Sequence, residues 1–469
     1  MLYQVANRLG IVKALGSNQK AKIILWLVMS KMMGAHSKLS AVRMARDHAI
    51  AEITGIRDFS EDDVYAALDW LYERKERVEK SLFRQKGEAP SIYLYDISST
   101  YLEGQQNELA AYGYNRDKKK GKKQIVFGLL TDEEGDPISV DAYKGNTKDN
   151  KTLEDQIEKL KKRFGCKYVT LVGDKGMIKG MEIKKIKGAG FHYITTITKS
   201  QIRKMITDGK FQLSLFDEEL IELYDHEEGL RYLLRRNPIR ADEIRSNRAK
   251  KIERIKERVK KSNEYLIRHP RGKVKTQEKI IKEYIKKLRM ENIVKIGVNS
   301  RERAIEVGLD EDRLKEVSEL DGCYVIKTDL PEEVAIKEVV HERYKDLSKV
   351  EWAFRTQKSG YLEVRPIFLR TEQHTVAHLV ITMLAYKIER YLRRAWEEFD
   401  ITVEEGLHKL NKITSTIIKV GKSKICSVAQ PDRVQKKMIK AIKAEIPNFL
   451  PYRQIKVVTR KKLKKSGQL

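Results

Sequence analysis

Cysteine is scarce in this sequence. The 469 residues include three cysteines, Cys166, Cys323 and Cys426, which lie far apart along the chain. This spacing excludes a CxxC pair and a disulfide framework. We therefore expect three incidental buried thiols in a protein of the reducing cytosol.

The sequence also lacks a long apolar run. No stretch of 18 or more apolar residues occurs, so no membrane-spanning helix is expected. The apolar run IILWLVM at residues 23–29 is too short to span a membrane, and no cleavage site follows it. This run is typical of a core helix rather than of a signal peptide.

Acidic residues are too few to balance the basic ones. Asp and Glu number 67 against 95 Lys and Arg, which gives a formal net charge of +28 and a pI near 9.6. Such a charge predicts a polyanionic partner, and nucleic acid is the first choice. An anionic membrane surface is the second, but no lipidation motif and no polybasic anchor beside an apolar span supports it.

The chain is long enough for about two to four structural units with a sizeable core. Residues 1–88 have helical periodicity, and Ser60 before EDD has the features of a helix N-cap. We expect a helical N-terminal domain here. It is either a DNA-binding domain or a scaffold packed against the main domain, because nothing in the pattern fixes a helix-turn-helix.

Residues 89–198 alternate between strand and helix patterns. Three antiparallel strands followed by alternating helices and strands indicate a mixed α/β layer around one central sheet. The expected strands are 91–97, 124–130, 137–143, one within KYVTLVGDKG and 191–197, and the expected helices are about 151–163 and 178–188.

Residues 199–330 interrupt this pattern and are predicted to be an insertion into the sheet domain. A possible hairpin leads into two highly charged helical runs, roughly 239–266 and 274–290, and a strand at 323–329 ends the segment. The charged runs are interpreted either as solvated amphipathic helices with Glu–Lys support or as helices that contact phosphates on one face.

Residues 331–395 return to the main domain. Pro331 is expected in the first turn of a helix that runs to Lys358. An apolar helix follows from His374. Residues 396–469 are predicted to be a basic helical C-terminal region, and its tail, RKKLKKSGQL, is expected to be disordered.

Two acids share one setting in the central segment. Asp96 in SIYLYDISST and Asp174 in KYVTLVGDKG are each predicted to terminate an apolar strand. If the two strands are neighbours, both carboxylates emerge at the same sheet edge, where they repel each other unless a cation lies between them. Oxygen ligands without His or Cys select Mg²⁺ or Mn²⁺. Each aspartate taken alone is better explained as a turn residue or a helix N-cap.

A third acid follows from helical geometry. Tyr344, Glu351 and Lys358 recur at intervals of seven, and Arg355 lies four residues after Glu351, so all four are predicted to share one helix face. On such a face the acid binds metal and the cations hold DNA phosphates. A plain amphipathic helix with a Glu351–Arg355 pair explains the same spacing.

Other candidate groups lack the residues that their chemistry needs. A nucleophile at Ser98 or Ser99 would require a histidine base, and none is visible nearby. His374 and His378 have the spacing of a zinc-binding pair, but no HExxH glutamate and no obvious third ligand accompany them. We expect these histidines in the core or on a helix surface, and Trp352 in the core.

Three motifs together resemble a known family. YDISST, LVGDKG and YKDLSKVEWAFRTQKSGYLEVRPIF are similar to the DDE domain of bacterial insertion-sequence transposases of the IS4 type, closest to the IS1634 group. That family's signature is Tyr, two residues, Arg, three residues, Glu, six residues, Lys. It falls on Tyr344, Leu347, Glu351 and Lys358, and Leu347 in the Arg position puts one phosphate contact in doubt. YKGNTKDNKTL and RPIFLRTEQHTVAHL also match, so the resemblance runs from about residue 90 to the high 380s.

The resemblance implies an RNase H-like fold and a metal-binding triad of Asp96, Asp174 and Glu351. It implies two Mg²⁺ ions, for which Mn²⁺ can substitute, and DNA contacts at Tyr344 and Lys358. The reaction would be hydrolysis at the 3′ end of a mobile element, followed by attack of that 3′-OH on target DNA.

The same resemblance implies double-stranded DNA as the partner, in the form of terminal inverted repeats and target, together with a homodimer in the DNA complex. We expect a prokaryotic, cytoplasmic and nucleoid-associated protein without membrane contact. Two alternatives stay open. One is a non-catalytic DNA-binding regulator derived from a transposase, and the other is a host nuclease of the same fold.

Overall fold

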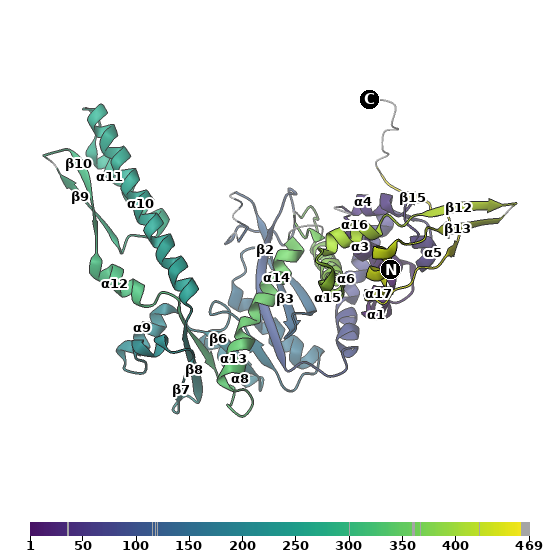
Figure 1. Ribbon diagram of the computed structural model, residues 1–469, viewed down its shortest axis with the longest axis horizontal. Helices are drawn as coiled ribbons and strands as arrows, with labels where there is room; N and C mark the ends of the chain where they lie inside the picture. The colour runs from purple at the N-terminus through teal and green to yellow at the C-terminus, as the bar shows by residue number, and fades with distance from the viewer. Residues whose placement is uncertain are drawn as a thin grey trace. The chain divides into compact units, whose positions relative to one another are not determined.

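The computed structural model of the chain describes residues 1–34, 37–114, 116–117, 119, 121–299, 301–358, 362–365, 367–421 and 423–460 (Figure 1). The predicted disordered tail therefore lies, from residue 461 on, outside the described residues. The chain divides into two compact units. The first is Met1–Tyr193 together with Glu342–Leu469, and the second is Ile194–His341.

The N-terminal region is helical, as its periodicity predicts. Ser60 begins the long helix α6 as expected, because its hydroxyl accepts the backbone N–H of Asp63 while the Asp63 carboxylate accepts the Ser60 backbone N–H at 2.7 Å. The elements are α1 (Leu2–Arg8), α2 (Ile11–Leu15), α3 (Gln19–Met32), α4 (Lys38–Met44), α5 (Ile50–Thr54), β1 (Phe59–Ser60) and α6 (Glu61–Arg84).

The first unit holds a mixed sheet with the strand order β4-β3-β2-β5-β6. Strand β3 is antiparallel to both of its neighbours, whereas β2 and β5 are parallel. This is the strand order of an RNase H-like fold, so the predicted fold class is confirmed. The elements are β2 (Ile92–Tyr101), β3 (Gln124–Asp132), β4 (Pro137–Lys144), η1 (Asp149–Thr152), α7 (Leu153–Glu158), η2 (Lys159–Arg163), β5 (Thr170–Val172), α8 (Gly180–Gly188) and β6 (His192–Thr196).

Strand β2 is longer than its sequence suggested. The prediction that Asp96 terminates this strand is wrong, because β2 continues to Tyr101. Its partner β3 pairs along the full length, from Tyr93 opposite Asp132 to Tyr101 opposite Gln124. A long antiparallel partner thus extends the strand through small polar residues that have little strand propensity of their own.

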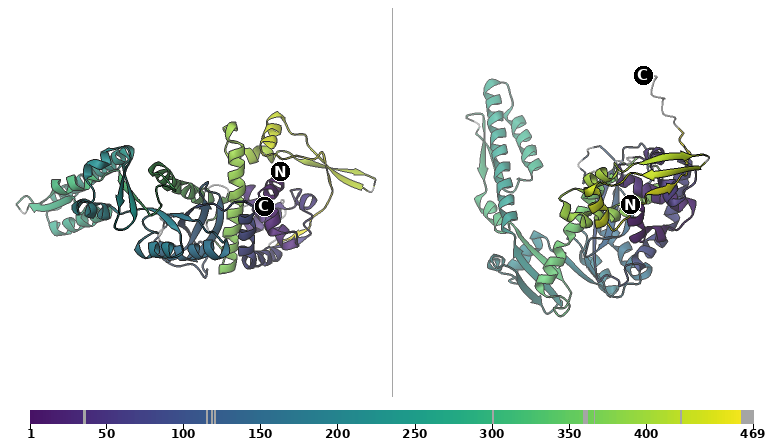
Figure 2. Two further views of the ribbon diagram at one scale, coloured as in Figure 1. Left: turned by 90° about the horizontal axis from the view of Figure 1, so that it is seen from below. Right: turned by 45° about the vertical axis from the view of Figure 1, so that its right-hand side comes forward.

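The helix that carries Glu351 is also shorter than predicted. Residues 337–358 form two helices, α13 (Lys337–Lys345) and α14 (Leu347–Lys358), and Asp346 lies between them. Pro331 is not in the first turn of a helix, because α13 begins six residues later. In the first unit, α14 packs against β2, while the apolar helix α15 (Glu372–Ala395) packs against β4, α3 and α6. Figure 2 shows α15 beside the N-terminal helices.

The second unit contains the predicted hairpin and both charged helices. Strands β7 and β8 form the hairpin, and β11 pairs antiparallel with β8 and with the end of β6. The elements are α9 (Lys199–Thr207), η3 (Leu213–Asp217), β7 (Ile221–Asp225), β8 (Leu230–Arg236), α10 (Pro238–Arg268), α11 (Val274–Leu288), β9 (Val294–Asn299), β10 (Ala304–Leu309), α12 (Glu311–Glu319) and β11 (Cys323–Thr328).

The C-terminal region differs from the predicted basic helical segment, because it also forms a three-stranded antiparallel sheet, β12-β13-β14. The β-branched residues of TIIKV and KICSV, on either side of Gly421, favour these strands. None of the described helices combines the length and apolar character needed to cross a membrane, and all three cysteines are buried. The elements are η5 (Glu397–Phe399), α16 (Val403–Leu410), β12 (Ser415–Val420), β13 (Ser423–Val428), α17 (Arg433–Ala441), β14 (Phe449–Pro451) and β15 (Val457–Val458).

Candidate active site

Strand register brings Asp96 and Asp174 to the same place in the first unit. The parallel pairing of β2 with β5 ends with Leu94 opposite Val172. Each aspartate lies two residues beyond its member of that pair, so both emerge where β5 stops and β2 continues. The sequence prediction located the shared edge correctly, although only one of the two strands ends there.

The electrostatics of Asp96 place all three predicted acids near one another. The pKa of Asp96 is raised to about 7, chiefly by burial and in part by the negative charges of Asp174 and Glu351. Two groups oppose this shift, namely the backbone N–H of Ile97, which donates to Asp96 Oδ1 at 2.7 Å, and the guanidinium of Arg116. Two like charges therefore act on one partly buried carboxylate, an arrangement that a cation would relieve.

Helix α14 reaches this face of the sheet through aromatic packing. Phe354 of α14 meets Phe127 of β3 edge to face, with ring centroids 5.2 Å apart. Phe127 is paired with Ser98, which shares the face of Asp96 because the two lie two residues apart on β2. Glu351, one turn before Phe354 and exposed, is thus carried on a helix that packs against the Asp96 face.

The β3–β4 turn fixes α14 in place. Lys349 of α14 donates to the Glu133 carbonyl at 2.6 Å, and Arg390 of α15 pairs with Asp136 at 2.6 Å. Gly135 has a left-handed φ of 79°, and a Cβ there would come within 2.8 Å of Lys349 Cβ. The glycine therefore serves both the turn conformation and the close approach of the helix.

Asp174 is also a turn cap. Its Oδ1 accepts the backbone N–H groups of Gly176 and Met177, both at 2.9 Å. Oδ2 accepts no hydrogen bond from the described residues. The capping interpretation and the ligand interpretation therefore do not compete, because one oxygen orders the turn and leaves the other for a further ligand.

The three acids fit a hard divalent cation by chemistry, since they offer only oxygen ligands. Within the part of the chain that the structure describes, however, no three His, Cys, Asp or Glu side chains are gathered closely enough to hold a metal ion. The carboxylates thus interact electrostatically without forming a closed cage.

The structure separates the predicted DNA-contacting side chains. Tyr344 is on α13 and Arg355 on α14, so the single helix face predicted for them does not exist. The Lys358 ammonium pairs with Asp117 at 3.1 Å. Trp352 is 46% exposed rather than in the core, and Arg355 lies 5.8 Å from its ring centroid.

Sequence reasoning missed the part played by the β2–β3 loop. Asp117 in this loop pairs with both Lys358 and Arg365, the latter at 2.9 Å. Arg116 pairs with Asp149 at 2.8 Å and lowers the pKa of Asp96 by its charge. The loop sequence NRDKKKGKK is typical of a solvated basic segment. Only the position of the loop beside β2 shows that Arg116 and Asp117 interact with residues around the site.

The two helical histidines have separate partners. His374 pairs with Asp69 at 2.9 Å, whereas buried His378 contacts the Lys38 ammonium through Nδ1 at 2.8 Å. The pKa of Lys38 is lowered to about 7, chiefly by burial and in part by the nearby charge of Lys31. The histidines thus belong to the packing around α15, as the sequence predicts.

Comparison with known proteins decides the family. Residues 88–388 match the family described as Transposase DDE domain. The chain belongs to this family. A search of curated proteins gave no match. Among solved structures the chain is similar to the piggyBac transposase in a synaptic complex with hairpin DNA, with 8% identity over 90% of this chain and 70% of that one and a TM-score of 0.38.

Proposed function

We propose that this chain is an active DNA transposase of the IS4 type, closest to the IS1634 group, which cleaves DNA at the ends of its element and transfers the strand to target DNA. The observation that carries the proposal is that Asp174 and Glu351 lie close enough to Asp96 for their charges to raise its pKa. Perturbed carboxylates of this kind are typical of functional sites.

Asp96 would bridge two Mg²⁺ or Mn²⁺ ions, and Asp174 and Glu351 would each hold one. Bound in this way, the ions would stabilise the attacking and leaving oxygens of an in-line phosphoryl transfer. The chain itself supplies a fixed Asp174, ordered by its turn, and a Glu351 held by the packing of α14 on the sheet.

Tyr344, Arg355 and Lys358 are proposed to contact the phosphates of the element end. Lys358 already pairs with Asp117, so a DNA phosphate would have to replace that carboxylate as the partner of the ammonium. We further propose a homodimer that pairs two element ends, acting on nucleoid DNA in a prokaryotic cytoplasm.

The test is cleavage and strand transfer on a labelled duplex that carries the inverted repeats flanking the gene, with Mg²⁺ or Mn²⁺. Asp174→Asn should abolish both reactions while binding to the ends persists. Asp208→Asn, the same change at an exposed aspartate of the second unit, should behave as wild type.

If the wild type binds its ends but never cuts them, the proposal fails and the regulatory alternative is favoured. If the wild type cuts but joins no strand to target, the nuclease alternative is favoured instead. If Asp174→Asn cuts normally, the triad assignment is wrong.

A further inference from the structure

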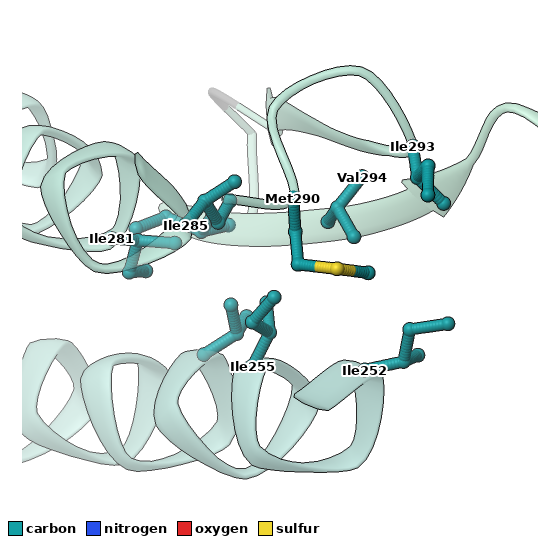
Figure 3. Close-up of a cluster of buried hydrophobic side chains, with 9 residues drawn as sticks. Ile252, Ile255, Ile281, Ile285, Met290, Ile293 and Val294 are labelled. Carbon is teal, nitrogen blue, oxygen red and sulfur yellow. The ribbon is translucent and has the colours of Figure 1, made fainter. Parts of the chain in front are cut away.

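Part of the second unit is a helical arm with its own core. It consists of α10, α11, β9 and β10, and Figure 3 shows Ile252 and Ile255 of α10 pointing toward the side chains of α11 and the β9 region. The buried positions of α10 recur every three or four residues along one seam. Most of the remaining surface of this 31-residue helix is exposed.

The arm is strongly basic. Residues 238–290 contain nineteen Lys and Arg against seven Asp and Glu. The sequence leaves two interpretations open, solvated amphipathic helices or phosphate contact. The pairing of the individual charges decides between them.

Some cations on the arm have acidic partners. Arg245 pairs with Asp242 at 3.1 Å, and Lys256 pairs with Glu253 at 3.0 Å. These pairs account for the charges on one flank of α10 as ordinary surface ion pairs.

Another row of cations on α10 is different. Lys250, Arg254, Arg258 and Lys261 are exposed, and none of them takes part in an ion pair within the described chain. At roughly 100° per residue they fall within an arc of about 80°, spaced by four, four and three residues over about 16 Å. Like charges at such spacing destabilise a helix, so folding alone does not favour this row.

We propose that this row, Lys250, Arg254, Arg258 and Lys261, binds the phosphate backbone of double-stranded DNA. Phosphates on one strand of the duplex recur about every 3.4 Å of rise, so the row spans about five base pairs. Contacts of Lys and Arg side chains to phosphates carry no sequence information. The row therefore holds flanking or target DNA irrespective of its sequence. Glu257 borders the row and opposes such binding.

This inference rests on the proposed function only in taking DNA as the polyanion. The experiment uses the full-length protein and a fluorescent 30-base-pair duplex of arbitrary sequence, and affinity is measured between 50 and 300 mM salt. Changing Lys250, Arg254, Arg258 and Lys261 together to Gln should flatten the slope of log affinity against log salt by about 3 to 4, because each lost phosphate contact removes about 0.9.

The matched control is a second variant that loses the same number of positive charges, but at cations that pair with acidic side chains. Arg245, Lys256, Lys282 and Lys295 are exposed and each pairs with an acid, so their joint replacement by Gln should change the slope by less than about one. Glu257→Gln should tighten binding. Circular dichroism melts of all variants should coincide with that of wild type, because every changed position is on the surface.

Equal slope changes in the row variant and the control would overturn the inference, since net charge alone would then explain binding. A row variant that loses affinity for duplex RNA but keeps its affinity for DNA would also overturn it. The proposed function can fail independently of this inference. If the wild type never cleaves its ends but the row variant still shows a flatter slope of log affinity against log salt, the DNA-binding row is supported and the transposase activity is not.

Discussion

Asp96 and Asp141 are two aspartates of one sheet with opposite surroundings. Asp96 is opposite Leu129, which is opposite Val140, so Asp141, the next residue, lies on the other face of the sheet. Asp96 is surrounded by other acids, and its pKa is raised to about 7. Burial would also raise the pKa of Asp141, but Lys75 at 2.7 Å and a close Lys159 hold it well below its ordinary value.

The difference separates an acid that we propose to be catalytic from an acid that stabilises the fold. Asp141 ties α6 and η2 to β4, and the neighbouring Glu79 extends this network to Arg163 at 2.8 Å. Every charge in that network has a partner, as a buried charge requires. Among the described residues no ion pair involves Asp96, Asp174 or Glu351, although the charge of Arg116 lowers the pKa of Asp96, so an external cation can still pair with these acids.

The largest expected effect comes from Asp96→Asn. Cleavage should fall by roughly 10³-fold or more, the scale on which one member of an interdependent catalytic set acts. The free energy of unfolding should stay unchanged or rise, because the amide removes a crowded negative charge. Cleavage assays and urea unfolding check both halves, and a variant that unfolds easily would show that Asp96 is structural after all.

Asp141→Asn should do the reverse. Removing one partner from a buried ion network costs about 3–5 kcal/mol of unfolding free energy, because Lys75 and Lys159 are left buried without their anion. Urea unfolding gives the loss, and cleavage per folded molecule should be retained at low temperature. A loss of unfolding free energy below about 1 kcal/mol would show that Asp141 is not the structural acid that the comparison with Asp96 requires.

Lys38 extends the comparison to a buried cation without an acid. Its pKa of about 7 in the folded chain lies below the ordinary value of 10.5, so the unfolded chain binds more protons between these two pH values. Stability should therefore rise with pH from about 7 to 10, by up to about 1.4 kcal/mol per unit. Urea midpoints at pH 7, 8 and 9 should show this rise, and Lys38→Met should remove it. An identical slope in the variant would assign the rise to other groups.

Gly176→Ala should have the smallest effect. A Cβ there would lie 3.2 Å from Oδ1 and 3.4 Å from Oδ2 of Asp174, so the carboxylate must move slightly. Cleavage should fall by roughly tenfold, less than the 10²-fold cost of a 1 Å misplacement. Gly188→Ala, where a Cβ meets nothing within 4 Å, is the control. Equal activity of both variants would show that the Asp174 carboxylate tolerates the shift.

Local pattern predicted the order of elements well where it was strong. The β7–β8 hairpin, both charged helices and the N-cap at Ser60 follow from turn residues and periodicity. The errors fall where tertiary pairing overrides local preference. Strand β2 runs past Asp96 because β3 pairs with it, and the helix expected through Lys358 breaks at Asp346.

The sequence by itself was enough to propose the acid trio, because an acid beside an apolar strand and a spaced motif around Glu351 are local features of the chain. It also determined the basic charge that predicts a polyanion. Only the tertiary structure decided which charges have partners. The pairing of Lys358 with Asp117 and of Lys75 with Asp141 depends on residues brought together by folding. Composition counts charges, but electrostatic energy depends on the distances between them.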